Sequence, residues 1–239
     1  MVPAPNDGGA IAPPDPWDPV VRLTHWAVVL AVLVNDVIVK PGGVVHVWVG
    51  WALMAVLILR FVWGLVGPRA ARFSAFPPDP RATLSHLADV ARGRGREYPS
   101  HTPAGAMMVY TLWALLVVVV LTGLVMTQGK TPIAIAEEKA AVAAGDWSVL
   151  VRDGDGDHDG AEKSDFVQEI HDVAANLILL LAILHVGGVA VESRLLKRSL
   201  VRPMIGPKPG PKPGPKPGPK PDPKSGPKSG PKPARSRSR

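Results

Sequence analysis

Residues 171–185 read HDVAANLILLLAILH, a segment that carries a histidine at each end and is apolar in between except for Asp172 and Asn176. His171 and His185 are fourteen residues apart. In an α-helix, fourteen residues at about 100° each return to within about 40° of the starting direction and rise about 21 Å. That rise is about two-thirds of the hydrocarbon core of a bilayer. One helix can therefore present a histidine near each side of a membrane on the same face.

Three further segments are as apolar as this one. With it they make four predicted helices, at residues 20–39, 45–66, 104–127 and 166–193, each close to the about 20 residues needed to span a bilayer. The mean hydropathy of the 239 residues is +0.15, and the length suits one domain. The sequence thus predicts an all-α integral membrane four-helix bundle over 20–200, after a proline-rich segment, 1–19, and before a basic tail, 201–239.

Cysteine and charge exclude several classes of protein. The chain has no cysteine, which excludes disulfides, thiolate-held iron–sulfur clusters and covalently attached c-type haem, and leaves imidazole as the strong metal ligand. The net charge is +7, but the tail alone carries eleven Lys or Arg and one acid, which leaves −3 for the rest. The body is therefore not a nucleic-acid binder. The Gly-Pro-Lys-Pro repeats of the tail predict a disordered polyproline-II segment, for which anionic lipid is the candidate partner.

The loops predict the orientation of the helices in the membrane. The connection 67–103 has six arginines, whereas the connection 128–165 has four basic and nine acidic residues. By the positive-inside rule both termini and the arginine-rich loop face the cytoplasm, and the acidic loop faces outside. The first twenty residues lack Lys and Arg, so the first apolar segment is expected to be a retained helix rather than a signal peptide. The Asp-Gly run in the acidic loop hints at calcium, but Phe166 stands where an EF-hand needs Glu, which favours a plain acidic loop.

The predicted topology sorts four histidines into two pairs. His25 lies at the cytoplasmic start of the first helix and His46 at the outer start of the second. The last helix runs inward, so His171 is outside and His185 is inside. His25 then matches His185 in depth, and His46 matches His171. Two imidazoles on one haem iron give a saturated low-spin centre that passes electrons. We therefore expect two haems between the first, second and fourth helices, with these histidines as axial ligands.

Two arginines are candidate partners of the haem propionates. Arg60 lies fourteen residues after His46, hence on the same face and at the depth of His185. A bidentate guanidinium suits a carboxylate, and Arg22 near the start of the first helix is the second candidate. The alternative for Arg60 is an extended side chain that reaches the cytoplasmic headgroups.

Small and polar residues near the histidines allow two interpretations each. Gly50 follows His46 by one turn, and Gly187 and Gly188 follow His185 directly. A porphyrin lies flat on a helix only where side chains are small, but glycines also ease helix packing. Asp36, at the outer end of the first helix, either lines a proton or quinone path or marks a solvated helix end.

The other histidines have no partner at ligand spacing in the sequence. His86 and His101 fall in the arginine-rich loop and His158 in the acidic loop. We expect all three to be surface residues.

Four motifs carry a family resemblance: WDPVVRLTHW at 17–26, HVWVGW at 46–51, LRFVWGLVGPR at 59–69, and HDVAAN at 171–176 with His185 beyond it. They resemble the bacterial cytochrome b561 family, which includes the b-type subunits of nickel–iron hydrogenases. The resemblance extends from about Trp17 to Ile205. It implies a multi-pass protein of the bacterial inner membrane that binds b-type haem at the four histidines and exchanges electrons with the quinone pool.

The sequence then favours a dihaem cytochrome b, with two haems per chain, between quinone or quinol and a redox partner outside. The alternative is a haem-bearing anchor subunit of a hydrogenase or c-type cytochrome complex. Hydrogenase subunits commonly have a further helix, which favours the stand-alone protein. The third hypothesis is that the chain is a haem-free scaffold or a transporter component. The sequence leaves open the electron direction, a homodimer, and whether the chain is an electron carrier or a quinone-linked oxidoreductase.

Overall fold

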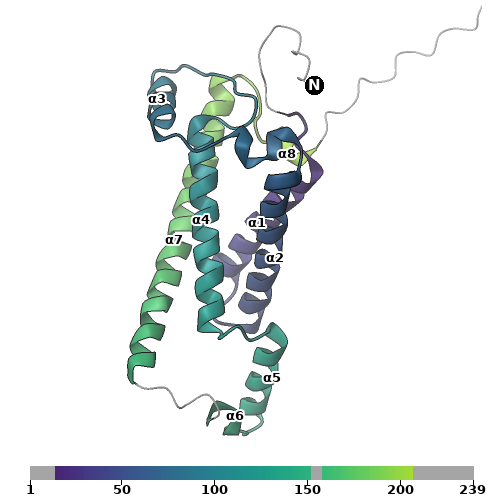
Figure 1. Cartoon of the computed structure of the whole chain (residues 1–239), viewed down its shortest axis with the longest axis vertical. Coiled ribbons are helices and arrows are strands. Elements are labelled where there is room, and N and C mark those ends of the chain that lie inside the picture. The colour runs from purple at the N-terminus through teal and green to yellow at the C-terminus, as the bar shows by residue number, and fades with distance from the viewer. Residues whose placement is uncertain (1–13, 152–157, 207–239) are drawn as a thin grey trace, which may run out of the picture. The chain divides into compact units, whose positions relative to one another are not determined.

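Four long helices form the body of the protein (Figure 1). The computed structural model describes residues 14–151 and 158–206. The long helices are α1 (Pro19–Leu33), which continues as a π-helical turn over Val34–Ile38, α2 (Val44–Val66), α4 (Pro103–Met126) and α7 (His158–Leu195). All four are long and apolar enough to cross a membrane, and the described residues contain no strand. The predicted all-α bundle with four membrane-spanning helices is confirmed.

Aspartate or threonine followed by proline starts α1, α4 and two shorter helices. Proline suits the first helical position because its φ angle is already helical and it needs no hydrogen-bond acceptor. The residue before it caps the helix, since its side-chain oxygen accepts from the free backbone N–H groups of the first turn. The caps are Asp18 for α1, Asp79 for α3 (Pro80–Ala91), Thr102 for α4 and Thr131 for α5 (Pro132–Ala143).

The helices pack as two close pairs. The closest backbone contacts join α4 with α7 and α1 with α2, and α2 also touches α4. In the described part of the chain, α7 does not pack closely along α1 or α2. Leu53 and Leu57 of α2 meet Ala31, Leu116 and Ile178 in the buried core. The two pairs are thus held together at mid-bundle and leave room between α7 and the first two helices.

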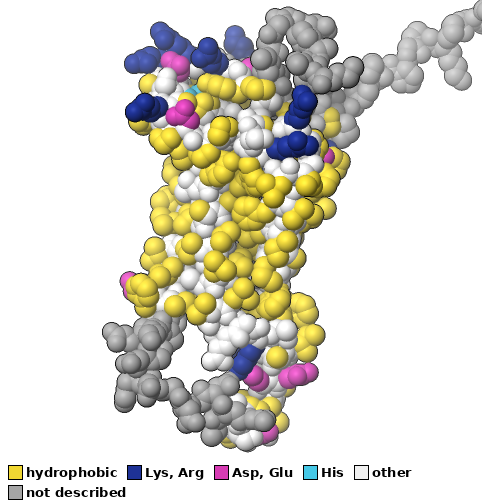
Figure 2. Space-filling model, in the orientation of Figure 1, with side chains coloured by type: hydrophobic (Ala, Val, Ile, Leu, Met, Phe, Trp, Pro, Cys, Tyr) yellow, Lys and Arg dark blue, Asp and Glu magenta, His cyan; other side chains and the backbone are white. Residues whose placement is uncertain are grey.

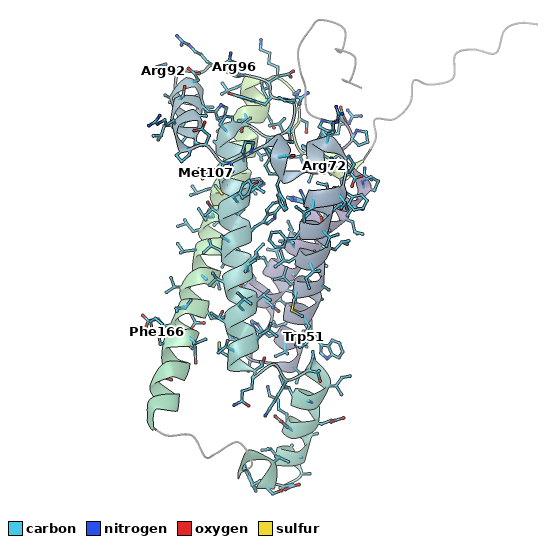
Figure 3. All side chains as sticks on the ribbon, viewed as in Figure 1. Trp51, Arg72, Arg92, Arg96, Met107 and Phe166 are labelled. Atoms are coloured by element: carbon cyan, nitrogen blue, oxygen red, sulfur yellow. The ribbon has the colours of Figure 1, made fainter. Side chains whose placement is uncertain are left out.

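Hydrophobic side chains cover the middle of the bundle (Figure 2). Ile183 and Leu184 of α7 are 70% and 54% exposed. Exposed aliphatic side chains along a helix of this length are typical of a surface that faces lipid. Arg72, Arg92 and Arg96 all lie at the end of the bundle where α1 and α4 begin, and we call it the basic end (Figure 3). The end where α2 begins is called the far end.

Both long connections contain helices of their own. Helix α3 lies at the basic end, and α5 and α6 (Ser148–Val151) lie at the far end (Figure 1). A short helix, α8 (Arg202–Ile205), follows α7. Three features named in the sequence fall outside the described residues: most of the proline-rich start, the Asp-Gly run of the acidic loop and the Gly-Pro-Lys repeats.

Hydrogen bonds from two tryptophans fix α1 at the basic end. Asp18 Oδ1 accepts from the backbone N–H of Val20 at 2.9 Å and from Trp63 Nε1, near the end of α2, also at 2.9 Å. Trp26 Nε1 donates to the carbonyl oxygen of Met204 in α8 at 2.9 Å. The start of α1 is therefore fixed to α2 and to the segment after α7, and this sets the position of His25.

Candidate functional site

The structure brings four histidines together as two pairs across the space beside α7. His46 of α2 faces His171 of α7 at the far end, with ring centroids 6.1 Å apart and ring planes at 56°. His25 of α1 faces His185 of α7 at the basic end, at 6.4 Å and 57°. The fourteen-residue spacing on α7 places both of its histidines on one face, about 21 Å apart along the axis.

The ring separations fit a metal ion held between two imidazoles. A metal–imidazole bond is about 2 Å and the ring centre lies about 1.1 Å beyond the nitrogen, so two trans imidazoles have centres about 6.3 Å apart. The observed values of 6.1 and 6.4 Å agree with this geometry. Each pair therefore has the ring separation that a bis-histidine centre requires.

A pocket opens beside the far-end pair. It contains about 510 Å³ of empty space, including its open mouth, and Asn35, His46, Gly50, Gly123, Thr127 and His171 contribute to its lining. A Cβ atom at Gly50 would have no described atom within 4 Å, and the same holds at Gly187 and Gly188 beside His185. Among the described residues, therefore, nothing packs on the Cβ side of these three glycines. Open space over a glycine next to each pair fits a flat macrocycle.

The two rings of the far-end pair differ in their second nitrogen. His171 Nδ1 is hydrogen-bonded to Thr122 Oγ1 of α4 at 2.9 Å. His46 Nδ1 is buried and has no hydrogen-bond partner among the described residues. Thr122 was not predictable from the sequence, because it lies 49 positions from His171 on a helix without histidines.

The two candidate propionate partners have different surroundings. Arg60 is 8% exposed, so it does not reach the headgroups, and the alternative of an extended side chain is wrong. Its Nη1 and Nη2 approach the carbonyl oxygen of Ala71 at 3.5 and 3.4 Å, and its guanidinium lies 4.8 Å above the Trp113 ring. Arg22 is half-buried, and its Nε and Nη1 are buried with no hydrogen-bond partner among the described residues. Buried donors without an acceptor are costly, which makes Arg22 the better match for an anionic group.

Asp36, the third polar candidate, lies at the far end. It is exposed on the π-helical turn that ends α1. This position agrees with a solvated helix end.

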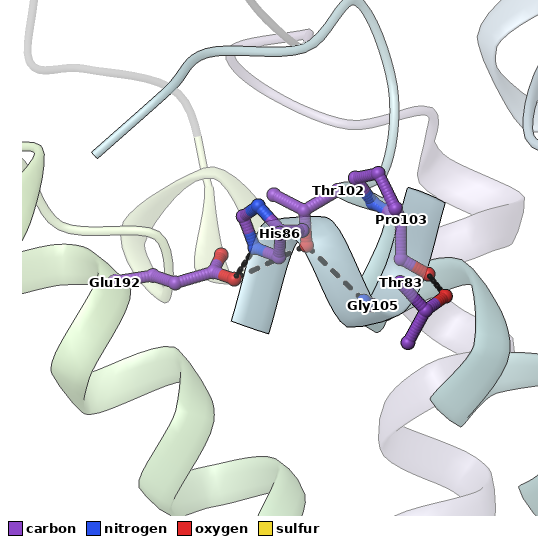
Figure 4. A network of polar contacts seen from close by, with 6 residues as sticks. All are labelled: Thr83, His86, Thr102, Pro103, Gly105 and Glu192. Atoms are coloured by element: carbon purple, nitrogen blue, oxygen red, sulfur yellow. Dashed lines mark hydrogen bonds and ion pairs between the residues drawn. The ribbon is translucent and has the colours of Figure 1, made fainter. Parts of the chain in front are cut away.

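The expectation that His86 and His101 are surface residues is wrong for His86, whereas His101 is half-buried. His86 of α3 is 4% exposed, and its Nε2 lies 2.8 Å from Glu192 Oε1 of α7 (Figure 4). Thr102 Oγ1 donates to the same carboxylate oxygen at 3.1 Å and also caps α4. This network fixes α3 to the basic ends of α4 and α7. The sequence could not reveal it, because Glu192 lies 106 positions from His86.

His101 is enclosed by aromatic rings. Its ring centroid lies 4.2 Å from that of Phe76 and 5.1 Å from that of Trp17, and its Nδ1 lies 3.0 Å from Ser100 Oγ. Burial, with smaller contributions from the nearby charges of Arg60 and the basic-end histidines, lowers the pKa of His101 to about 4. The ring is therefore neutral at physiological pH.

These features define an α-helical membrane protein with two facing histidine pairs near opposite ends of one membrane-spanning helix. A family model described as prokaryotic cytochrome b561 matches residues 16–207, so the chain belongs to the prokaryotic cytochrome b561 family. Neither the curated proteins nor the solved structures contain a significant match. Membership makes the chain a b-type cytochrome that transfers electrons in a bacterial membrane, with b-type haem as its cofactor.

Proposed function

We propose that this chain is a dihaem cytochrome that carries electrons across the cytoplasmic membrane, between the quinone pool and a redox partner on the outer side. The observation that carries the proposal is the presence of two facing histidine pairs, at 6.4 and 6.1 Å, near opposite ends of one membrane-spanning helix. A single pair would serve one side of the bilayer. Two pairs about 21 Å apart on α7 cover about two-thirds of the hydrocarbon core.

Each residue of the two pairs has the same task in this proposal. His25 and His185 hold one haem, and His46 and His171 hold the other. When bound, b-type haem would supply a one-electron iron centre, which the two imidazoles of each pair would hold. The surrounding leucines and valines exclude water, and the ring orientations and nearby charges adjust the redox potential.

The arginines near the basic-end pair supply positive charge for the propionates. Arg22 is the first candidate because two of its guanidinium nitrogens are buried without a partner. Arg60 is the second, since its two contacts with Ala71 are long, at 3.4 and 3.5 Å, and its charge lies close enough to influence His101. In both cases a charge-assisted hydrogen bond to a carboxylate would repay the desolvation of the guanidinium.

The proposal includes the orientation of the chain. The basic end carries Arg92, Arg94 and Arg96, all exposed, and the positive-inside rule then puts this end in the cytoplasm. Both termini of the described segment lie at this end, and α5 would face outside. The quinone exchange rests on the family resemblance alone.

A second candidate function is a haem-bearing anchor for a partner on the outer side. The far end favours it, because Trp147 and Ile133 lie beyond the membrane-spanning helices and are 62% and 57% exposed. A large aromatic and an aliphatic side chain in that position suit a protein interface.

The test is the haem content of the purified protein. A dithionite-reduced minus oxidised spectrum with a pyridine haemochrome assay should give two haems per chain. His46→Ala combined with His171→Ala should remove one haem and leave the other. His86→Gln, which keeps a donor toward Glu192, is the matched control and should keep both. If the unaltered chain binds only one haem, one of the two histidine pairs is not a haem site. If it binds none, the proposed function is wrong.

A further inference from the structure

The hydroxyl proton of Thr122 points to a backbone carbonyl oxygen of its own helix rather than to the ring of His171. Its Oγ1 lies 2.8 Å from the carbonyl oxygen of Val118, 3.1 Å from that of Val119 and 2.9 Å from His171 Nδ1. The hydroxyl has one proton, and carbonyl oxygens only accept. A helical threonine donates to the carbonyl four residues back, and this is the shortest of the three contacts. The oxygen then accepts from His171, whose proton lies on Nδ1.

The position of that proton decides which nitrogen can bind a metal. A neutral imidazole carries one proton, so a protonated Nδ1 leaves the lone pair on Nε2. The hydrogen bond also fixes the ring orientation and raises the basicity of the ligand.

Asn35 lies beside His46. Its Nδ2 donates to the carbonyl oxygen of His46 at 3.2 Å, which fixes the direction of the amide. Its Oδ1 and His46 Nδ1 are both buried without a hydrogen-bond partner among the described residues, and both residues line the same pocket. Asn35 Oδ1 is thus an acceptor without a donor, and His46 Nδ1 becomes a donor when Nε2 of His46 binds a metal. Asn35 lies on the π-helical turn that ends α1, and such turns are frequent at functional sites.

We propose that Thr122 and Asn35 are positioning residues for the far-end haem: Thr122 fixes the tautomer of His171, and Asn35 accepts from Nδ1 of His46. The inference rests on the proposed function, and it names the two residues that orient the histidines of the far-end site. The basic-end pair lacks this support, since no hydrogen bond within the described chain reaches the ring of His25 or His185. The two sites therefore differ in ligand basicity.

The direct test of Thr122 measures the tautomer without haem. In haem-free protein labelled with ¹⁵N at histidine, the His171 Nδ1 signal should have the chemical shift of a protonated nitrogen and Nε2 that of an unprotonated one. Thr122→Val removes the hydroxyl and keeps the shape, so it should mix the two tautomers. Thr122→Ser restores the hydroxyl and should restore the single tautomer.

The second test measures the haem-loaded protein. Thr122→Val should raise the midpoint potential of one haem only and weaken its binding by about 10- to 100-fold. Asn35→Leu should act on the same haem and in the same direction, whereas Asn35→Asp keeps an acceptor. Thr111→Val is the matched control, because Thr111 lies on the same helix, is exposed and donates only to the carbonyl oxygen of Met107.

The contrary outcomes are distinct. An unprotonated His171 Nδ1 in the unaltered chain, or equal shifts in Thr122→Val and Thr122→Ser, would overturn the role of Thr122. Unchanged potentials in Asn35→Leu would overturn that of Asn35. In each case a protein that still holds two haems leaves the proposed function intact. If the unaltered protein binds no haem at all, the proposed function is wrong, but the tautomer of His171 measured by ¹⁵N is unaffected by that result.

Discussion

Replacement of Gly50 by leucine should separate the stability of the chain from its ability to bind the far-end haem. Gly50 lies one turn after His46 on α2 and lines the far-end pocket. A Cβ atom at this position would meet nothing in the described chain within 4 Å, so the protein itself does not resist a side chain here. A bound haem macrocycle would resist a side chain at Gly50, because both would occupy the same space.

The two effects have opposite signs. Glycine inside a helix is about 0.8 to 1.0 kcal/mol less favourable than alanine, and leucine is close to alanine, so the haem-free helix gains about 0.8 kcal/mol. A side chain forced into a filled site costs about 1 to 3 kcal/mol. Since 1.4 kcal/mol is a factor of ten, affinity for the far-end haem should fall about 5- to 150-fold. The basic-end haem should be unaffected.

The assay pairs thermal unfolding of the haem-free protein with haem stoichiometry during titration. Gly50→Leu should unfold at the same or a higher temperature and saturate with one haem at concentrations where the unaltered chain holds two. Gly50→Ala, with a smaller side chain, should lie between them. Two haems bound with unaltered affinity in Gly50→Leu would refute the reasoning, because the open space over Gly50 would then belong to lipid.

Three further predictions follow from the basic end. Arg22→Gln should lower the midpoint potential of the basic-end haem by tens of millivolts, since a lost positive charge disfavours the reduced form; redox titration measures it. Gly64→Ala should cost about 1 to 3 kcal/mol in thermal unfolding, because its Cβ would lie 2.5 Å from Cε2 of Phe73. His101, with a pKa of about 4 against 6.5 in the unfolded chain, stays neutral while the unfolded chain gains a proton. Stability should thus be unaffected by His101 above pH 6.5 and fall by up to about 3 kcal/mol towards pH 4, and His101→Gln should remove that loss.

The fold was largely predictable because hydrophobicity over about 20 residues is a local property. The four spans and the two histidines on one face of α7 need only the helical period. Helices α3 and α5 lie outside the predicted spans, although Asp79-Pro80 and Thr131-Pro132 carry the same local capping signal as Asp18-Pro19 at the start of α1.

The supporting residues of the site were not predictable, because their contacts depend on how helices pack. Thr122 touches His171 only because α4 lies against α7, and a helical threonine far from any histidine carries no signal. Arg22 and Arg60 are both arginines within apolar segments, so the sequence does not show which of them has a partner in the chain. The segment around Ala71 gives Arg60 an acceptor, whereas Arg22 Nε and Nη1 have no hydrogen-bond partner among the described residues.

The same supporting residues predict an order for the two redox potentials. Hydrogen bonds to the far-end histidines, as proposed for Thr122 and Asn35, make those ligands more basic and favour the oxidised iron. Positive charge near the basic-end pair, from Arg22 and Arg60, favours the reduced iron. Both effects give the basic-end haem the higher midpoint potential. Redox titration of the unaltered protein and of His46→Ala with His171→Ala assigns each potential to its site. If the haem that survives in the double variant has the lower potential, burial and solvent access outweigh the polar contacts, and the order is reversed.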